Sequence, residues 1–80
     1  MQNEKEKIYV LIDESVQVDI EKYPKDIRVL AEMLEEFAKK NEWIMFDSYA
    51  DCLEATAKQC LITDMITEAE FDKVLARYGR

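Results

Sequence analysis

The C-terminal stretch DMITEAEFDKVLARYGR, residues 64–80, decides the fold, because it carries the start, the buried face and the end of one helix. Thr67 and Glu70 have the spacing of a capping box, in which each side chain binds the free backbone N–H of the other residue. Ile66 and Phe71 have the spacing of the hydrophobic staple that accompanies such a box. The stretch therefore predicts a helix that begins at Thr67.

The rest of this stretch predicts where the helix ends and which of its residues pack against the rest of the domain. Gly79 is placed to end the helix in the left-handed conformation, and the charges of Arg77 and Arg80 suit its negative end. The helix, predicted over 67–78, is marginal in water on its own at about twelve residues, so its apolar stripe must dock on the rest of the domain. That stripe consists of Phe71, Val74, Leu75 and Tyr78.

A second helix is expected over 25–40. Pro24 suits the start of a helix, because its φ is already helical and its missing N–H is not needed there. Lys39 and Lys40 stand at the other end, where positive charge is favourable. One apolar stripe joins the two ends, formed by Ile27, Leu30, Leu34, Phe37 and Ala38.

A third helix lies between these two, and its start has two interpretations. Asp47 or Ser48 caps a helix over 47–62, preceded by an apolar connector, or the helix begins as early as Asn41. The apolar pattern permits both, since it runs through Trp43, Phe46, Ala50, Leu53, Ala57 and Cys60.

The N-terminal third has the pattern of strands. The run KIYVLI, residues 7–12, is β-branched and aromatic, and the run SVQVDIE, residues 15–21, alternates apolar and polar side chains. Together they predict a two-stranded β-ribbon over 7–21. Its outer edges would carry unpaired backbone groups. Either helices cover one face and charged side chains guard these edges, or the edge near Tyr9 and Leu11 pairs with a second copy or a partner; apolar side chains on both faces of the first run favour pairing.

These elements predict an α+β fold, in which an N-terminal two-stranded β-ribbon is followed by three α-helices around a single small core. Eighty residues are expected to form one domain, 1–80, near the lower size limit for a core without staples. The charged residues 1–6 are expected to be disordered. We find no signal-peptide pattern and no apolar run long enough to span a membrane, so a soluble, cytoplasmic protein is expected.

The net charge of −7 is concentrated in one segment. Residues 42–72 hold eight acids and only one base, Lys58, so this segment alone accounts for the net charge. Direct binding to nucleic acid is not expected, because phosphate contacts need clustered lysine and arginine.

The residue types argue against catalysis and against a metal site. The chain has no histidine, and it has no glycine-rich phosphate loop. Cys52 and Cys60 are too far apart on one helix for a disulfide and are expected to be reduced, buried thiols. We therefore expect no enzymatic activity, no cofactor and no metal.

The stretch LITDMITEAEFDKVLARYG, residues 61–79, resembles the short helical C-terminal modules of the SHOCT type, in which Ile-Thr-Glu-x-Glu-Phe opens a final amphipathic helix. That resemblance covers about a quarter of the chain. It implies a role in oligomerisation and protein contacts. The whole chain is also similar to small uncharacterised proteins encoded by bacterial mobile elements and phages.

Two further surfaces are candidates for partner binding. Trp43, Met45 and Phe46 are residue types that interfaces favour, although plugging a junction between helices is the better-supported alternative. Asp47, Asp51 and Glu54 form a carboxylate stripe; either it is a solvated face with a Glu54–Lys58 pair or it imitates a row of phosphates.

From the sequence we expect a small acidic domain that acts in protein interaction or as an accessory protein, without catalysis. Self-association into a homodimer is compatible with this function. The partner is not identified. The alternative is an acidic nucleic-acid mimic that inhibits a nucleic-acid-binding protein. The partner-binding residues expected are Tyr9, Leu11, Trp43, Met45, Phe46, Asp47, Asp51 and Glu54.

Overall fold

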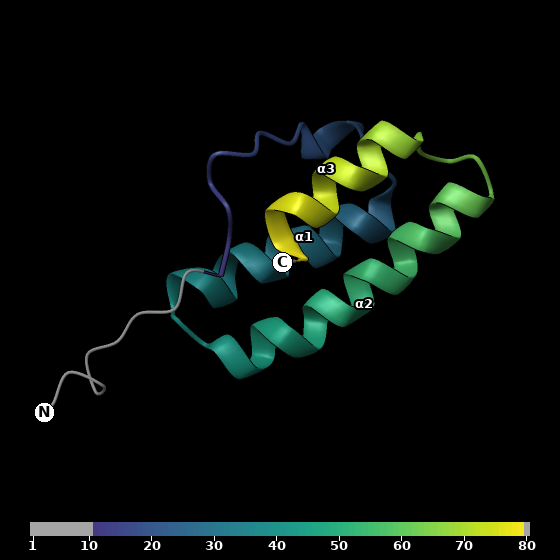
Figure 1. The fold of residues 1–80 in the computed structure, drawn as a ribbon. Coiled ribbons are helices and arrows are strands. Elements are labelled where there is room, and N and C mark those ends of the chain that lie inside the picture. The colour runs from purple at the N-terminus through teal and green to yellow at the C-terminus, as the bar shows by residue number, and fades with distance from the viewer. Residues whose placement is uncertain (1–10, 80) are drawn as a thin grey trace, which may run out of the picture.

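The computed structural model describes residues 11–79 and places three α-helices in them (Figure 1). After a single turn of 3-10 helix, η2 (Ile20–Lys22), come α1 (Lys25–Lys39), α2 (Trp43–Ile62) and α3 (Glu68–Tyr78). α1 and α2 form an antiparallel hairpin, and α3 turns back from the C-terminal end of α2 to lie beside both (Figure 1).

The expected α+β fold is wrong, because the described residues 11–79 contain helices and no strand. Of the part of the predicted ribbon that is described, residues 11–19 are irregular and residues 20–21 belong to η2. Leu11 and Ile12 are buried in the core, and Val18 and Ile20 pack against it. Apolar residues of an extended segment can face a helical layer as well as a strand partner, so alternation alone did not distinguish the two. Residues 7–10 of the predicted ribbon lie outside the described residues.

α1 buries the stripe expected of it. Pro24 precedes the helix in an extended conformation, and its carbonyl accepts the N–H of Arg28 at 3.0 Å. Three residues of α1 are buried, and the partly buried Leu30, Phe37 and Ala38 widen the stripe. The fully buried residues are Ile27, Ala31 and Leu34.

α1 and α2 end in the same way, with a residue other than glycine in the left-handed region. Asn41 has φ 55° and Asp64 has φ 63°. The residue after each donates its N–H to the carbonyl five residues back, from Glu42 to Phe37 at 2.9 Å and from Met65 to Cys60 at 2.8 Å. Asn41 and Asp64 also donate their own N–H groups three residues back, to Ala38 and Leu61, and the two pairs of bonds form two Schellman motifs. Asparagine and aspartate are the residues besides glycine that tolerate this conformation best.

α2 begins at Trp43, so the earlier of the two expected starts is nearer to the observed one. Glu42 precedes it, and the Glu42 carbonyl accepts the N–H of Phe46 at 2.9 Å. The buried residues of α2 follow the expected pattern except that Trp43 is exposed. They are Phe46, Ala50, Leu53, Ala57 and Cys60.

α3 has the predicted capping box. Thr67 donates its backbone N–H to the Glu70 carboxylate at 2.8 Å, and the Thr67 hydroxyl accepts the N–H of Glu70 at 3.1 Å. Gly79 differs from expectation, because its φ of −88° is right-handed. A Cβ at Gly79 would lie 2.9 Å from the Leu75 carbonyl oxygen, so the position requires glycine for close approach and not for a positive φ.

Candidate protein-binding surface

The first turn of α2 exposes three large apolar side chains next to one another. The exposed fraction is 42% for Trp43, 62% for Ile44 and 42% for Met45. Consecutive residues of a helix point in different directions, and in this turn only the Phe46 side chain, 1% exposed, is directed into the core. The three side chains line a shallow hollow of about 270 Å³ beside the α1–α2 connection. Single exposed apolar residues are ordinary, but three that line one hollow make this turn a candidate surface for protein binding.

Two residues expected to bind a partner are instead part of the core. Leu11 is buried, and Phe46 is among the largest fully buried side chains. Tyr9 lies outside the described residues. The structure therefore brings Trp43 and Met45 together at the surface and separates Phe46 from them.

The expected carboxylate stripe lies on the exposed side of α2. Asp47, Asp51 and Glu54 are all exposed. The Glu54 carboxylate is 3.9 Å from the Lys58 ammonium, with both side chains more than half exposed. Such an exposed pair contributes at most a few tenths of a kcal/mol, about 0.3, to stability.

The opposite end of α2 exposes a second apolar group, which sequence reasoning missed. The exposed fraction is 75% for Ile62 and 60% for Met65. A signal was present, because Ile44 and Ile62 are five helical turns apart and so lie on the same side of α2. Ile62 falls outside the apolar pattern that forms the core, so that pattern alone does not point to it.

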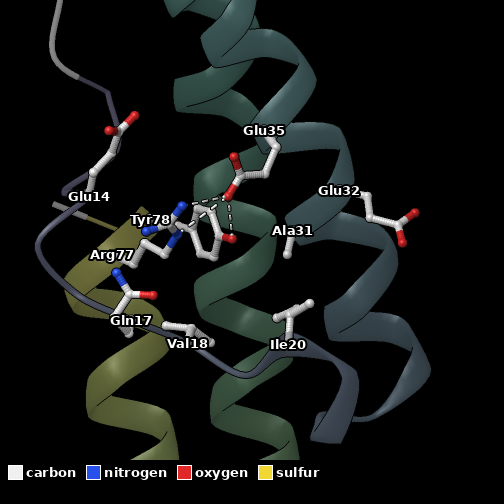
Figure 2. A pocket seen from close by; sticks show the side chains of 9 residues that line it. All are labelled: Glu14, Gln17, Val18, Ile20, Ala31, Glu32, Glu35, Arg77 and Tyr78. Carbon is white, nitrogen blue, oxygen red and sulfur yellow. Dashed lines mark hydrogen bonds and ion pairs between the residues drawn. The ribbon is translucent and has the colours of Figure 1, made fainter.

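A separate charged network fastens the N-terminal segment to the helices (Figure 2). Arg77 of α3 donates to the Glu35 carboxylate of α1 from Nε at 3.3 Å and from Nη2 at 3.0 Å. Tyr78 donates its hydroxyl proton to the same carboxylate oxygen at 2.7 Å. Arg77 also binds the Val16 carbonyl through Nη1 at 2.9 Å, and its own carbonyl accepts the N–H of Asp13. One arginine therefore joins three segments of the chain.

The burial of this network changes how its groups titrate. Burial, followed by the hydrogen bond to Glu35, raises the pKa of Tyr78 to about 12. Burial alone would lower the pKa of Arg77, but its interactions with Tyr78 and Glu35 outweigh that effect and raise the pKa. Both groups therefore keep their protons in any ordinary buffer.

A cavity of about 340 Å³ lies beside the network. Glu14 and Glu32 lie on opposite sides of the network, and the Arg77 guanidinium is already bound to Glu35 and Val16 (Figure 2). The network thus links the N-terminal segment, α1 and α3 at one edge of this cavity.

The two thiols occupy different environments. Cys52 is exposed, whereas Cys60 is buried, and both are free. The expectation that both thiols are buried is therefore wrong for Cys52. Burial, with a contribution from Asp26, raises the pKa of Cys60. Within residues 11–79 no three cysteine or carboxylate side chains are grouped closely enough to hold a metal ion.

No helix in the described part of the chain has the length and the apolar content needed to cross a membrane. Comparisons of the chain with protein families, with curated proteins and with solved structures found no match.

Proposed function

We propose that this protein is a small acidic interaction domain that binds another protein through the first turn of α2 and has no catalytic activity. One observation carries the proposal: Trp43, Ile44 and Met45 are exposed side by side. A domain of this size needs its large apolar residues for its core, so leaving three of them in water lowers solubility without adding stability. Tryptophan and methionine are also enriched in the cores of protein interfaces.

A tagged full-length protein tests this proposal in a pull-down from nuclease-treated lysate of the source organism. The wash rises from low salt to about 1 M, where screening is strong beyond about 3 Å. We expect a stoichiometric partner that survives the salt wash and is lost with Trp43→Ala. Val29→Ala is the matched control, because Val29 is 45% exposed on α1, away from the first turn of α2. Retention of the partner by Trp43→Ala would overturn the proposal.

The second candidate function is imitation of nucleic acid by the carboxylate stripe. The exposure of Asp47, Asp51 and Glu54 in a row along α2 supports it. This candidate predicts a nucleic-acid-binding partner that salt releases and that added DNA or RNA displaces. Full binding after charge reversal of all three carboxylates would exclude it.

A further inference from the structure

We infer that α2 binds a cationic amphipathic helix that carries a large apolar residue at each end. This inference rests on the proposed function and names the class of its partner. The binding surface, called here the outer face of α2, consists of Trp43, Ile44, Asp47, Asp51, Glu54 and Ile62.

The two ends of this face are apolar and aligned. Ile44 and Ile62 are eighteen residues apart, which is five turns of an α-helix, so both side chains point in the same direction along a line of roughly 27 Å. Trp43 lies beside Ile44 at one end, and Met65 follows Ile62 at the other. All four side chains are at least two-fifths exposed.

The middle of the face is acidic. Asp51 is seven residues, or nearly two turns, from Ile44 and therefore falls on the same line. Asp47 and Glu54 lie about one turn before and after it. Lys58 pairs with Glu54, whereas Asp47 and Asp51 form no ion pair with any described residue. Two carboxylates between the apolar ends are thus available to a cationic partner.

The charge pattern favours a foreign basic segment over a second copy. Two copies packed along this face would bring the carboxylates of one against those of the other, because residues 42–72 contain only one base. Nucleic acid is repelled for the same reason. Lysine or arginine side chains between two apolar anchors satisfy both parts of the face, and a helix keeps such anchors in register over five turns.

Among residues 11–79, the arrangement of the helices leaves one side of α2 open to such a partner. α1 packs against α2 along its length and α3 contacts it near its C-terminal end, while the opposite side of α2 forms the border of the bundle (Figure 1). A partner helix packs at an axial distance of 8–10 Å in general, which lets its side chains reach both the isoleucines and the carboxylates.

A designed peptide tests this inference with the full-length protein. The probe is a helical peptide of about 22 residues, mainly alanine, with leucines eighteen positions apart on one face and lysines between them on that face. One control peptide has glutamate in place of each lysine, and another has alanine in place of both leucines. Trp43 is the only tryptophan in the chain, so its fluorescence reports binding without a label.

We expect saturable binding of the lysine–leucine peptide at low salt and at least about tenfold weaker binding of both control peptides. Asp51→Lys and the double variant Ile44→Ser, Ile62→Ser should each weaken binding by about tenfold or more. The matched controls are Asp72→Lys on α3 and Val29→Ser on α1, both exposed positions off the outer face. These should change affinity by less than about twofold.

Three results would overturn the inference: no binding of the lysine–leucine peptide, equal binding of the peptide without leucines, or equal weakening by Asp51→Lys and Asp72→Lys. The partner captured in the pull-down shows whether only this inference fails or the proposed function fails as well. If a salt-resistant partner depends on Trp43 but not on Asp51 or Ile62, the proposed function stands and the cationic helix is wrong.

Discussion

Asp64 shows how a single residue ends a helix at some cost. It holds a left-handed φ of 63° after α2, and as an aspartate it also places negative charge at the negative end of the helix. Asp64→Gly should raise the free energy of unfolding by about 0.5–1 kcal/mol, because glycine adopts this conformation without strain. Chemical denaturation measures the change. Asn41→Gly is the control and should gain less, since asparagine tolerates this region better than most residues; a loss of stability in Asp64→Gly would contradict the account.

Tyr78 makes stability depend on alkaline pH. Its pKa is raised from 10 to about 12, so the folded state holds the phenol proton more tightly than the unfolded state. The stabilisation is complete below about pH 10 and is lost as pH rises through about 12, where Tyr78 would ionise beside Glu35. The unfolding midpoint, measured at steps of pH from 9 to 12, should fall less steeply in Tyr78→Phe than in the wild type. Equal pH dependence of the unfolding midpoint in the two proteins would contradict a raised pKa of Tyr78 in the folded state.

The capping box is the clearest device at the scale of an element. Thr67 and Glu70 bind each other's backbone N–H groups at an exposed helix start. Thr67→Ala should lower the free energy of unfolding by about 1 kcal/mol, and Thr67→Ser should leave it nearly unchanged because serine caps as well. Thermal unfolding followed by circular dichroism gives both values. If Thr67→Ser were as unstable as Thr67→Ala, the capping hydrogen bond would not be the cause.

Local signals in the sequence were sufficient for α1 and α3 and insufficient elsewhere. The start of α3 was predictable, because its capping box involves residues only three apart. The start of α2 was not, since Trp43 fits the apolar pattern yet is exposed, and only the packing against α1 decides that. The ribbon was predicted wrongly for the same reason: Val18 and Ile20 alternate with polar residues, but both pack against the core of the helical bundle.

The residues of the candidate site were also predictable where local spacing determines their position and not where tertiary packing does. Asp47, Asp51 and Glu54 were placed correctly on one exposed side, since their spacing fixes their position on a helix. Leu11 is buried and was misplaced, whereas the buried Phe46 fits the better-supported alternative of a residue packed between helices, because burial depends on the arrangement of all three helices. Ile62 was overlooked because its significance appears only when both ends of α2 are seen together.

At the scale of the whole molecule, residues close together in the sequence contribute very differently to stability, because the core is small. Phe46 is fully buried, whereas Trp43 is about two-fifths exposed. Phe46→Ala should lower the free energy of unfolding by about 3–5 kcal/mol, a large share of the roughly 5–15 kcal/mol typical of a domain. Trp43→Ala should cost less than about 1.5 kcal/mol, since its side chain is only partly buried. Urea denaturation of the two variants provides the comparison, and similar losses would mean that Trp43 belongs to the core.

The division between core and surface is also what allows the proposed function. The charged network of Arg77, Glu35 and Tyr78 joins the N-terminal segment, α1 and α3. The proposed binding surface on α2 lies outside that network, so variants of the outer face leave these hydrogen bonds in place.

The most direct measurement of the central claim is the fluorine NMR signal of Trp43. Protein labelled with 5-fluorotryptophan gives one signal, because the chain has one tryptophan. We predict that the difference in its chemical shift between H2O and D2O, which reports contact with solvent, disappears when the salt-resistant partner is bound. An unchanged solvent effect on Trp43 in the complex would contradict the claim that the first turn of α2 is the binding surface.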